Sequence, residues 1–173
     1  MRVPTLLLCA LVALAPLAAL AAPPDVGALL PDLKARDVNG AEHQLHQLVS
    51  LKGPALVVAI ADRDGADGMQ AWFDAADTRA PSAARVSIVS IHVPFFVSDD
   101  YARSKAREKV PEKWRSASLF DSDAKMAKQL GIEGKEPWVF VVAPDGQVLA
   151  RAHGAADGPE AEAIWRALKS ARR

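Results

Sequence analysis

Three aspartates and two glycines share one seven-residue stretch, residues 62–68, and their side chains could bind a cation. Asp62, Asp64 and Asp67 supply the carboxylate oxygens that a hard ion such as Ca²⁺ prefers. The glycines, Gly65 and Gly68, do not stand where a calcium-loop signature has glycine, and the distal bidentate glutamate is missing. The stretch therefore favours a solvated acidic turn, with a metal- or small-ligand-binding loop at the three aspartates as the alternative.

The chain has a single cysteine, Cys9, and it lies within a predicted leader. If the leader is removed, no disulfide, thiolate catalyst, Fe–S cluster or cysteine-ligated zinc is possible. The four histidines form no recognised metal motif. We expect His92 and His153 at opposite ends of the sheet, where they could not share an ion. The sequence thus predicts no cofactor and no thiol enzyme, and an unrecognised non-thiol enzyme is a further alternative.

The N-terminus has the features of an export signal. Arg2 precedes an apolar stretch from Leu6 to Leu20, and Ala19-Leu20-Ala21 has the small-x-small pattern of a cleavage site. This predicts a signal peptide over residues 1–21 and one domain over residues 22–173, with an uncleaved anchor as the alternative. The product is expected in the periplasm, or else outside the cell, with no stable membrane span after cleavage.

The charge balance excludes one class of partner. The chain carries 21 basic and 21 acidic residues, which leaves no net positive charge to bind nucleic acid. Half of the residues are apolar, so the domain can bury a core without disulfides.

Alternating strands and helices are expected to position these residues. A hairpin is predicted over residues 32–45 around Asn39-Gly40, followed by buried strands over residues 55–61 and 86–93. An amphipathic helix between the two strands makes a parallel, right-handed crossover. Four residues mark the apolar face of this helix: Met69, Trp72, Phe73 and Ala76.

The second half of the chain continues the alternation. A solvated helix is predicted over the charged residues 99–113, then a helix capped by Asp121 or Ser122 and closed by Gly131. Strands over residues 138–143 and 148–153 form a second hairpin. A final helix starting near Gly158-Pro159 is predicted to bury four residues: Ala161, Ile164, Trp165 and Leu168.

Three stretches carry a resemblance to a known family. They are residues 26–33 with Asn39-Gly40, residues 119–132, and residues 137–146 with Gly154. Their order and spacing resemble the thioredoxin-like superfamily, in its peroxiredoxin (AhpC/TSA-like) and cytochrome-maturation thioredoxin branch. The resemblance implies an α/β thioredoxin-like fold, with a central mixed β-sheet flanked by helices and an N-terminal β-hairpin.

The sequence departs from this family at the redox site. The resemblance implies that Gly65-Ala66-Asp67-Gly68 occupies the place of the family's CxxC motif, with glycine at each cysteine position. It also implies that Pro137 matches the family's cis-proline, which packs against that motif. We therefore expect neither disulfide exchange nor thiol peroxidase activity.

A protein or peptide partner is the predicted ligand of the degenerate face. The segments at residues 62–68 and 92–97 and the loop ending at Pro137 are expected to meet at the carboxyl ends of the strands. The candidate partner-binding residues there are His92, Phe95, Phe96 and Trp138. If these aromatic side chains are exposed together, they form a patch that a partner could cover. The alternative is that Phe95 and Phe96 cover an edge of the core.

Overall fold

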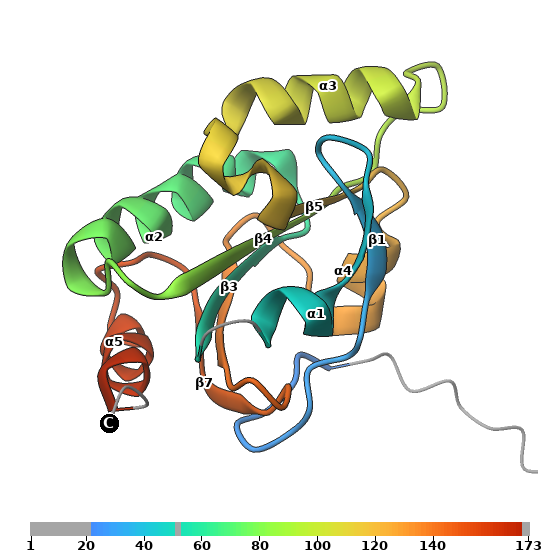
Figure 1. Cartoon of the computed structure of the whole chain (residues 1–173). Helices are drawn as coiled ribbons and strands as arrows, with labels where there is room; N and C mark the ends of the chain where they lie inside the picture. The colour runs from blue at the N-terminus through green and yellow to red at the C-terminus, as the bar shows by residue number, and fades with distance from the viewer. Residues whose placement is uncertain (1–21, 51–52, 171–173) are drawn as a thin grey trace, which may run out of the picture.

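A mixed seven-stranded sheet forms the centre of the protein (Figure 1). The structure is a computed structural model and describes residues 22–50 and 53–170. The strands lie in the order β2-β1-β5-β4-β3-β6-β7. Their bounds are β1 Lys34–Asp37, β2 Glu42–Gln44, β3 Ala55–Ile60, β4 Ala84–Ser90, β5 Ser118–Asp121, β6 Trp138–Val142 and β7 Val148–His153. The predicted α/β class, with helices on a mixed sheet, is confirmed.

Helices cover both faces of this sheet and divide the core into two clusters. Their bounds are α1 Leu45–Val49, α2 Ala66–Arg79, α3 Asp99–Lys109, α4 Lys125–Leu130 and α5 Ala161–Ser170, with 3-10 turns η1 Arg63–Gly65 and η2 Glu112–Ala117. Apolar side chains of α1 and α4 pack on one face, and those of α2 and α5 pack on the other. In Figure 1, α3 lies outside this arrangement, beyond η2. Its only buried residue is Arg103.

The central strands form because their residues are apolar on both faces. All six residues of β3 are buried, as expected of a strand covered by helices on both sides. β3 pairs with β4 in parallel and with β6 in antiparallel orientation. The predicted crossover between residues 55–61 and the second strand is therefore confirmed.

Helix α2 is fixed to the sheet by one large side chain. Trp72 is fully buried, and its indole N–H donates a 2.7 Å hydrogen bond to the carbonyl of Gly154, just after β7. The ring also packs against Trp165 of α5, with centroids 5.2 Å apart. The apolar faces predicted for both helices are confirmed, although Phe73 is only half-buried.

The first hairpin forms as predicted, but the sheet contains a strand that we did not predict. β1 pairs with β2 across a turn in which Gly40 has φ +95°, a conformation that favours glycine. On its other edge β1 pairs with β5, whose four residues are too short a run to show an alternating pattern. Because β5 also pairs in parallel with β4, the connection over residues 91–117 is a second crossover.

Several boundaries differ from the predictions, and α5 begins at Ala161 instead of near Gly158. β4 ends at Ser90, before Val93, and the solvated helix ends at Lys109 before η2 begins. α4 starts one turn after Asp121, whose carboxylate accepts from the N–H of Met126, whereas Ser122 donates to Asp99. Gly131 closes α4 with φ +63°, as predicted. Within residues 22–50 and 53–170, no helix is long and apolar enough to cross a membrane. The predicted leader, including Cys9, lies outside the described residues.

Candidate functional site

Several connecting segments meet at one edge of the sheet, where β3, β4, β5 and β7 end and β6 begins. We call residues 62–68, which follow β3, the glycine corner. Residues 92–98, which follow β4, are the aromatic loop, and residues 133–137, which precede β6, are the proline segment. Open α/β sheets bind ligands at this kind of edge. The topology thus places all three predicted segments on the same side of the molecule.

The glycine corner lies at the beginning of α2, as expected. Gly65 precedes the first residue of the helix, and Gly68 lies in its first turn. A Cβ atom on Gly65 would stand 2.8 Å from the carbonyl oxygen of Lys135 and 2.9 Å from Cγ2 of Ile60. A Cβ on Gly68 would stand 3.0 Å from Cδ of Pro137. Both glycines therefore allow the proline segment to lie directly against the corner.

A surface ion pair also joins the glycine corner to the proline segment. Nζ of Lys135 lies 2.8 Å from a carboxylate oxygen of Asp64. Hydrogen bonding to Lys135, and then its charge, lowers the pKa of Asp64 below its ordinary value of 3.8. The same two effects of Asp64 raise the pKa of Lys135 above 10.5. Both side chains are largely exposed, so this ion pair should contribute only modestly to stability. We call the Asp64–Lys135 ion pair the latch.

The three aspartates do not form the metal site considered above. Asp62 accepts a 2.8 Å hydrogen bond from the N–H of Asp64 and caps the 3-10 turn, while Asp64 is paired with Lys135. Among the residues that the structure describes, no group of three histidine, cysteine, aspartate or glutamate side chains could hold a metal ion. Asp62 and Asp64 thus have other partners in this conformation, which gives no support to the metal-binding alternative at Asp62, Asp64 and Asp67.

Pro137 packs where the resemblance places it, but its peptide bond has the other isomer. The residue is buried and contacts Gly68. No peptide bond in the described part of the chain is cis, so the expectation of a cis-proline is wrong.

The aromatic loop presents its two phenylalanines to solvent. Phe95 is 98% exposed and Phe96 is 77% exposed. The rings pack edge to face, with centroids 5.6 Å apart. The alternative in which these residues cover the core edge is therefore wrong, because neither ring lies against the core.

The other two candidate partner-binding residues are placed differently. Trp138 is half-buried and stacks on Phe140 and on His153, whose ring centroid is 4.4 Å away. His92 is exposed and forms an isolated antiparallel bridge with Asp123. The structure therefore brings together Phe95 and Phe96, and it places Trp138 in a separate aromatic stack.

The expectation that His92 and His153 lie at opposite ends of the sheet is wrong. β7 pairs antiparallel with β6, which pairs antiparallel with β3, so β7 runs parallel to β3 and β4. His153 and His92 consequently follow strands that end at the same edge. Three strand spacings separate β4 from β7, about 14 Å at the usual interval.

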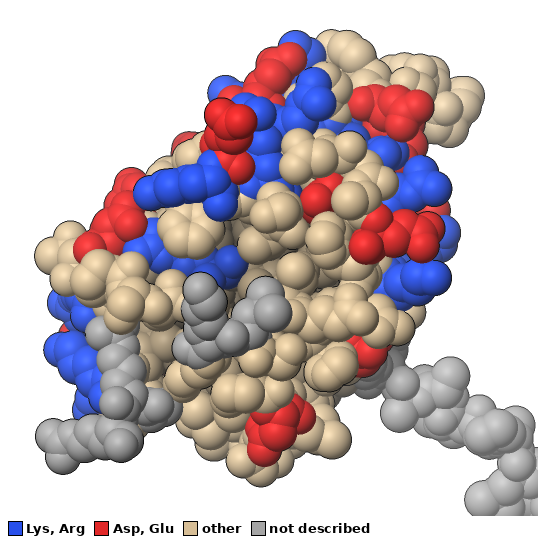
Figure 2. Space-filling view, viewed as in Figure 1, with Lys and Arg blue, Asp and Glu red and all other residues tan. Residues whose placement is uncertain are grey.

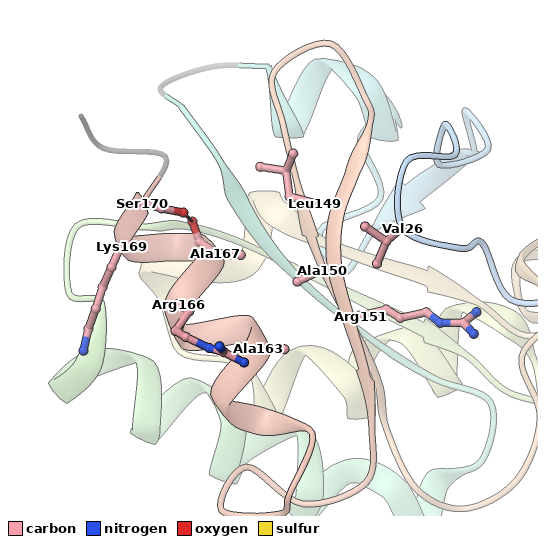
Figure 3. Close-up of a pocket in the computed structure, with 9 residues that line it drawn as sticks. All are labelled: Val26, Leu149, Ala150, Arg151, Ala163, Arg166, Ala167, Lys169 and Ser170. Carbon is pink, nitrogen blue, oxygen red and sulfur yellow. Dashed lines mark hydrogen bonds between the residues drawn. The ribbon is translucent and has the colours of Figure 1, made fainter.

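Two hollows in the surface of residues 22–50 and 53–170 are candidates for a ligand site. One, of about 490 Å³, lies beside the glycine corner and is lined by Asp62, Lys128, Glu133 and Lys135 among others. A larger one, of about 700 Å³, lies between β7 and α5. Figure 3 shows that two of its basic side chains, Arg151 and Lys169, extend in opposite directions. These two basic side chains of the larger hollow therefore do not point toward a common ligand position.

One residue that shapes the site was not predicted from the sequence. Lys135 contributes both its carbonyl against Gly65 and its ammonium group to Asp64. Its position two residues before Pro137, within an alternating run of charges, was the available signal.

The arrangement of strands and helices matches solved structures. Peroxidoxin BcpB from Mycobacterium tuberculosis superposes with a TM-score of 0.55 at 21% identity, covering 85% of this chain and 96% of that one. A putative thiol:disulfide interchange protein DsbE from Chlorobium tepidum gives 0.60 at 17% identity, with coverages of 85% and 97%. An SCO1/SenC family lipoprotein from Bacillus anthracis gives 0.58 at 12% identity, with coverages of 85% and 96%. The chain has a thioredoxin-like fold.

Sequence comparison adds no closer assignment. No family model matches the chain, and no curated protein matches it. The thioredoxin-like fold thus rests on structural similarity, and the second of these neighbours is named a thiol:disulfide interchange protein. This chain has one cysteine, Cys9, outside the described residues, so its glycine corner lacks the sulfur that such chemistry needs.

Proposed function

We propose that the chain is an exported thioredoxin-like domain that performs no thiol chemistry and binds a protein or peptide partner through the aromatic loop. The observation that carries the proposal is the exposure of Phe95 and Phe96, at 98% and 77%. Exposing apolar rings to water is unfavourable. Each Å² of apolar surface that a partner covers should contribute about 25 cal/mol to the free energy of binding. Large aromatic side chains are also the ones that most often dominate binding energy.

The glycine corner supports the proposed absence of thiol chemistry. In thioredoxin-like proteins that exchange disulfides, a cysteine at the helix N-terminus has its thiol pKa lowered by the helix dipole. Here Gly65-Ala66-Asp67-Gly68 begins α2, so the dipole has no thiol to activate. The close contact with the Lys135 carbonyl also leaves no space for a side chain at Gly65.

The leader supports export. Residues 1–21 have the pattern of a cleavable signal, and two structural neighbours are named lipoproteins. We propose residues 22–173 as the functional domain, with the periplasm as its compartment. Mass spectrometry of the N-terminus from the native host tests this proposal, and an intact Met1 would overturn cleavage after Ala21.

Site-specific photo-crosslinking in the native host tests partner binding. A photoreactive phenylalanine analogue at position 95 should give a defined adduct with another protein. The matched control carries the analogue at Leu29, which is 69% exposed on the N-terminal segment. We expect Phe96→Ser to abolish the adduct at position 95. Identical adducts at positions 95 and 29, or an adduct that survives Phe96→Ser, would contradict the proposal.

Activity assays test the absence of thiol chemistry. Purified protein carrying Cys9→Ser should show the background rate in insulin reduction and in peroxide consumption. A rate that exceeds background and scales with the amount of protein would contradict it.

A further inference from the structure

The aromatic loop is shaped as a protrusion that is held at both ends. The N–H of Val93 donates to the carbonyl of Ser122, and the N–H of Val97 donates to the carbonyl of Pro94, which closes a turn around the two phenylalanines. Ser98 then caps α3 by accepting from the N–H of Tyr101. Because both ends are fixed, little conformational freedom is lost when the rings are buried by a partner. A protruding pair of rings requires a concave apolar surface on that partner.

Acidic side chains flank this protrusion. Asp99 and Asp100 follow the loop directly, and their side chains are 52% and 90% exposed. Asp123, in the neighbouring segment that bridges to His92, is 61% exposed. In Figure 2, an uncharged protrusion near the start of α3 lies beside a group of Asp and Glu atoms. The surface next to the rings is therefore rich in carboxylates.

The nearby cations neutralise only part of this charge. Arg103 binds both Asp99 and Asp100, but its side chain is only 10% exposed and lies beneath them. Lys125 pairs with Asp123. Lys128 also acts on Asp123, and Asp121 acts on Lys125. Four carboxylates thus face three cations, which leaves the flank negative by about one charge.

We infer that the partner presents an apolar pocket flanked by lysine or arginine. This inference rests on the proposed function and adds the chemistry of the surface that binds. The apolar pocket would cover Phe95 and Phe96, and the basic groups would face Asp100 and Asp123. An anionic lipid surface is disfavoured by the same carboxylates, and a second copy of the chain would bring two negative flanks together.

A defined set of peptide probes tests the inference with the full chain carrying Cys9→Ser. One probe combines leucine and tryptophan with lysine, the second replaces each lysine with glutamate, and the third replaces the apolar residues with serine. We expect binding of the first probe only, weakened by added salt. Binding of the glutamate probe with equal affinity would overturn the charge assignment, whatever the variants do.

Protein variants separate this inference from the proposed function. Asp100→Asn should weaken binding of the lysine probe about two- to fivefold and flatten its salt dependence. The control Asp74→Asn, an exposed carboxylate on α2, should leave both unchanged. Phe95→Ser with Phe96→Ser should abolish binding. If only Asp100→Asn has no effect, the charge inference fails and the proposed function stands, whereas if the double serine variant still binds, the proposed function fails.

Two further measurements test the two other surfaces that could cover the rings, an anionic membrane and a second copy of the chain. Vesicles with and without anionic lipid should not bind the protein, and sedimentation should show a monomer at the concentrations used for peptide binding. Binding to anionic vesicles, or self-association that the double serine variant loses, would overturn the inference in favour of that occupant.

Discussion

The glycine corner and the aromatic loop lie at the same edge of the sheet and have opposite character. At the corner, the backbone of α2 and the proline segment approach so closely that Gly65 has no space for a side chain. At the loop, two rings extend into solvent with no contact to the core clusters. The difference indicates that packing determines the residues of the corner, whereas stability of the fold does not account for Phe95 and Phe96.

Of changes in the glycine corner and the aromatic loop, the largest stability effect should come from adding a methyl group to the corner. Gly65→Ala should lower the free energy of unfolding by about 1–3 kcal/mol, because the new Cβ meets a backbone carbonyl that cannot move alone. The opposing gain from reduced unfolded-chain entropy is smaller, about 0.4–1 kcal/mol. Urea unfolding measures the change.

A neighbouring substitution controls for that measurement. Ala66→Ser changes an exposed residue in the same turn and should stay within about 0.5 kcal/mol of the wild type. Equal unfolding midpoints for Gly65→Ala and the wild type would show that the proline segment is not packed against the corner.

Breaking the latch should have a smaller, pH-dependent effect. Lys135→Met should lower the thermal midpoint slightly at neutral pH. The lowered pKa of Asp64 adds stability above pH 3.8 that is lost as the pH falls through the folded value. The raised pKa of Lys135 adds stability below pH 10.5 that is lost as the pH rises through its folded value. The difference from wild type should therefore close at both extremes.

The matched control for the latch is Lys128→Met. Lys128 lines the same hollow and forms no ion pair with any residue in the described ranges. Its midpoint should follow the wild type at every pH. A Lys135→Met difference that is unchanged in 1 M salt would rule out the ion pair as its cause.

The smallest stability effect should come from the aromatic loop. Phe95→Ala with Phe96→Ala should change the free energy of unfolding by less than about 0.5 kcal/mol, because neither ring is buried. Phe120→Ala, at a ring that is 5% exposed in β5, should cost about 3–5 kcal/mol. Thermal melts compare the two variants, and a large loss from the double variant would mean that the rings are part of the core.

Strong local patterns made most of the fold predictable. The continuous apolar run of β3, the Asn39-Gly40 turn and the helical spacing around Trp72 and Trp165 each had one consistent interpretation. β5 was missed because its four residues acquire strand structure only by pairing between β1 and β4. Tertiary pairing of this kind leaves little trace in a short sequence.

The site was predictable only in its location. The order of the elements placed residues 62–68, 92–97 and Pro137 at one edge, because topology fixes where strands end. The pairing of Asp64 with Lys135 and the isomer at Pro137 depend on distances that residue spacing does not encode. Exposure of Phe95 was likewise open, since an apolar loop residue can face either the core or solvent.

The close contact at Gly65 also limits which sequences this protein can reach by single substitutions. A cysteine at position 65 would need the Cβ that the Lys135 carbonyl and Ile60 exclude. A side chain at position 65 is therefore accommodated only if the proline segment shifts, so these two segments, distant in the chain, are coupled through their packing.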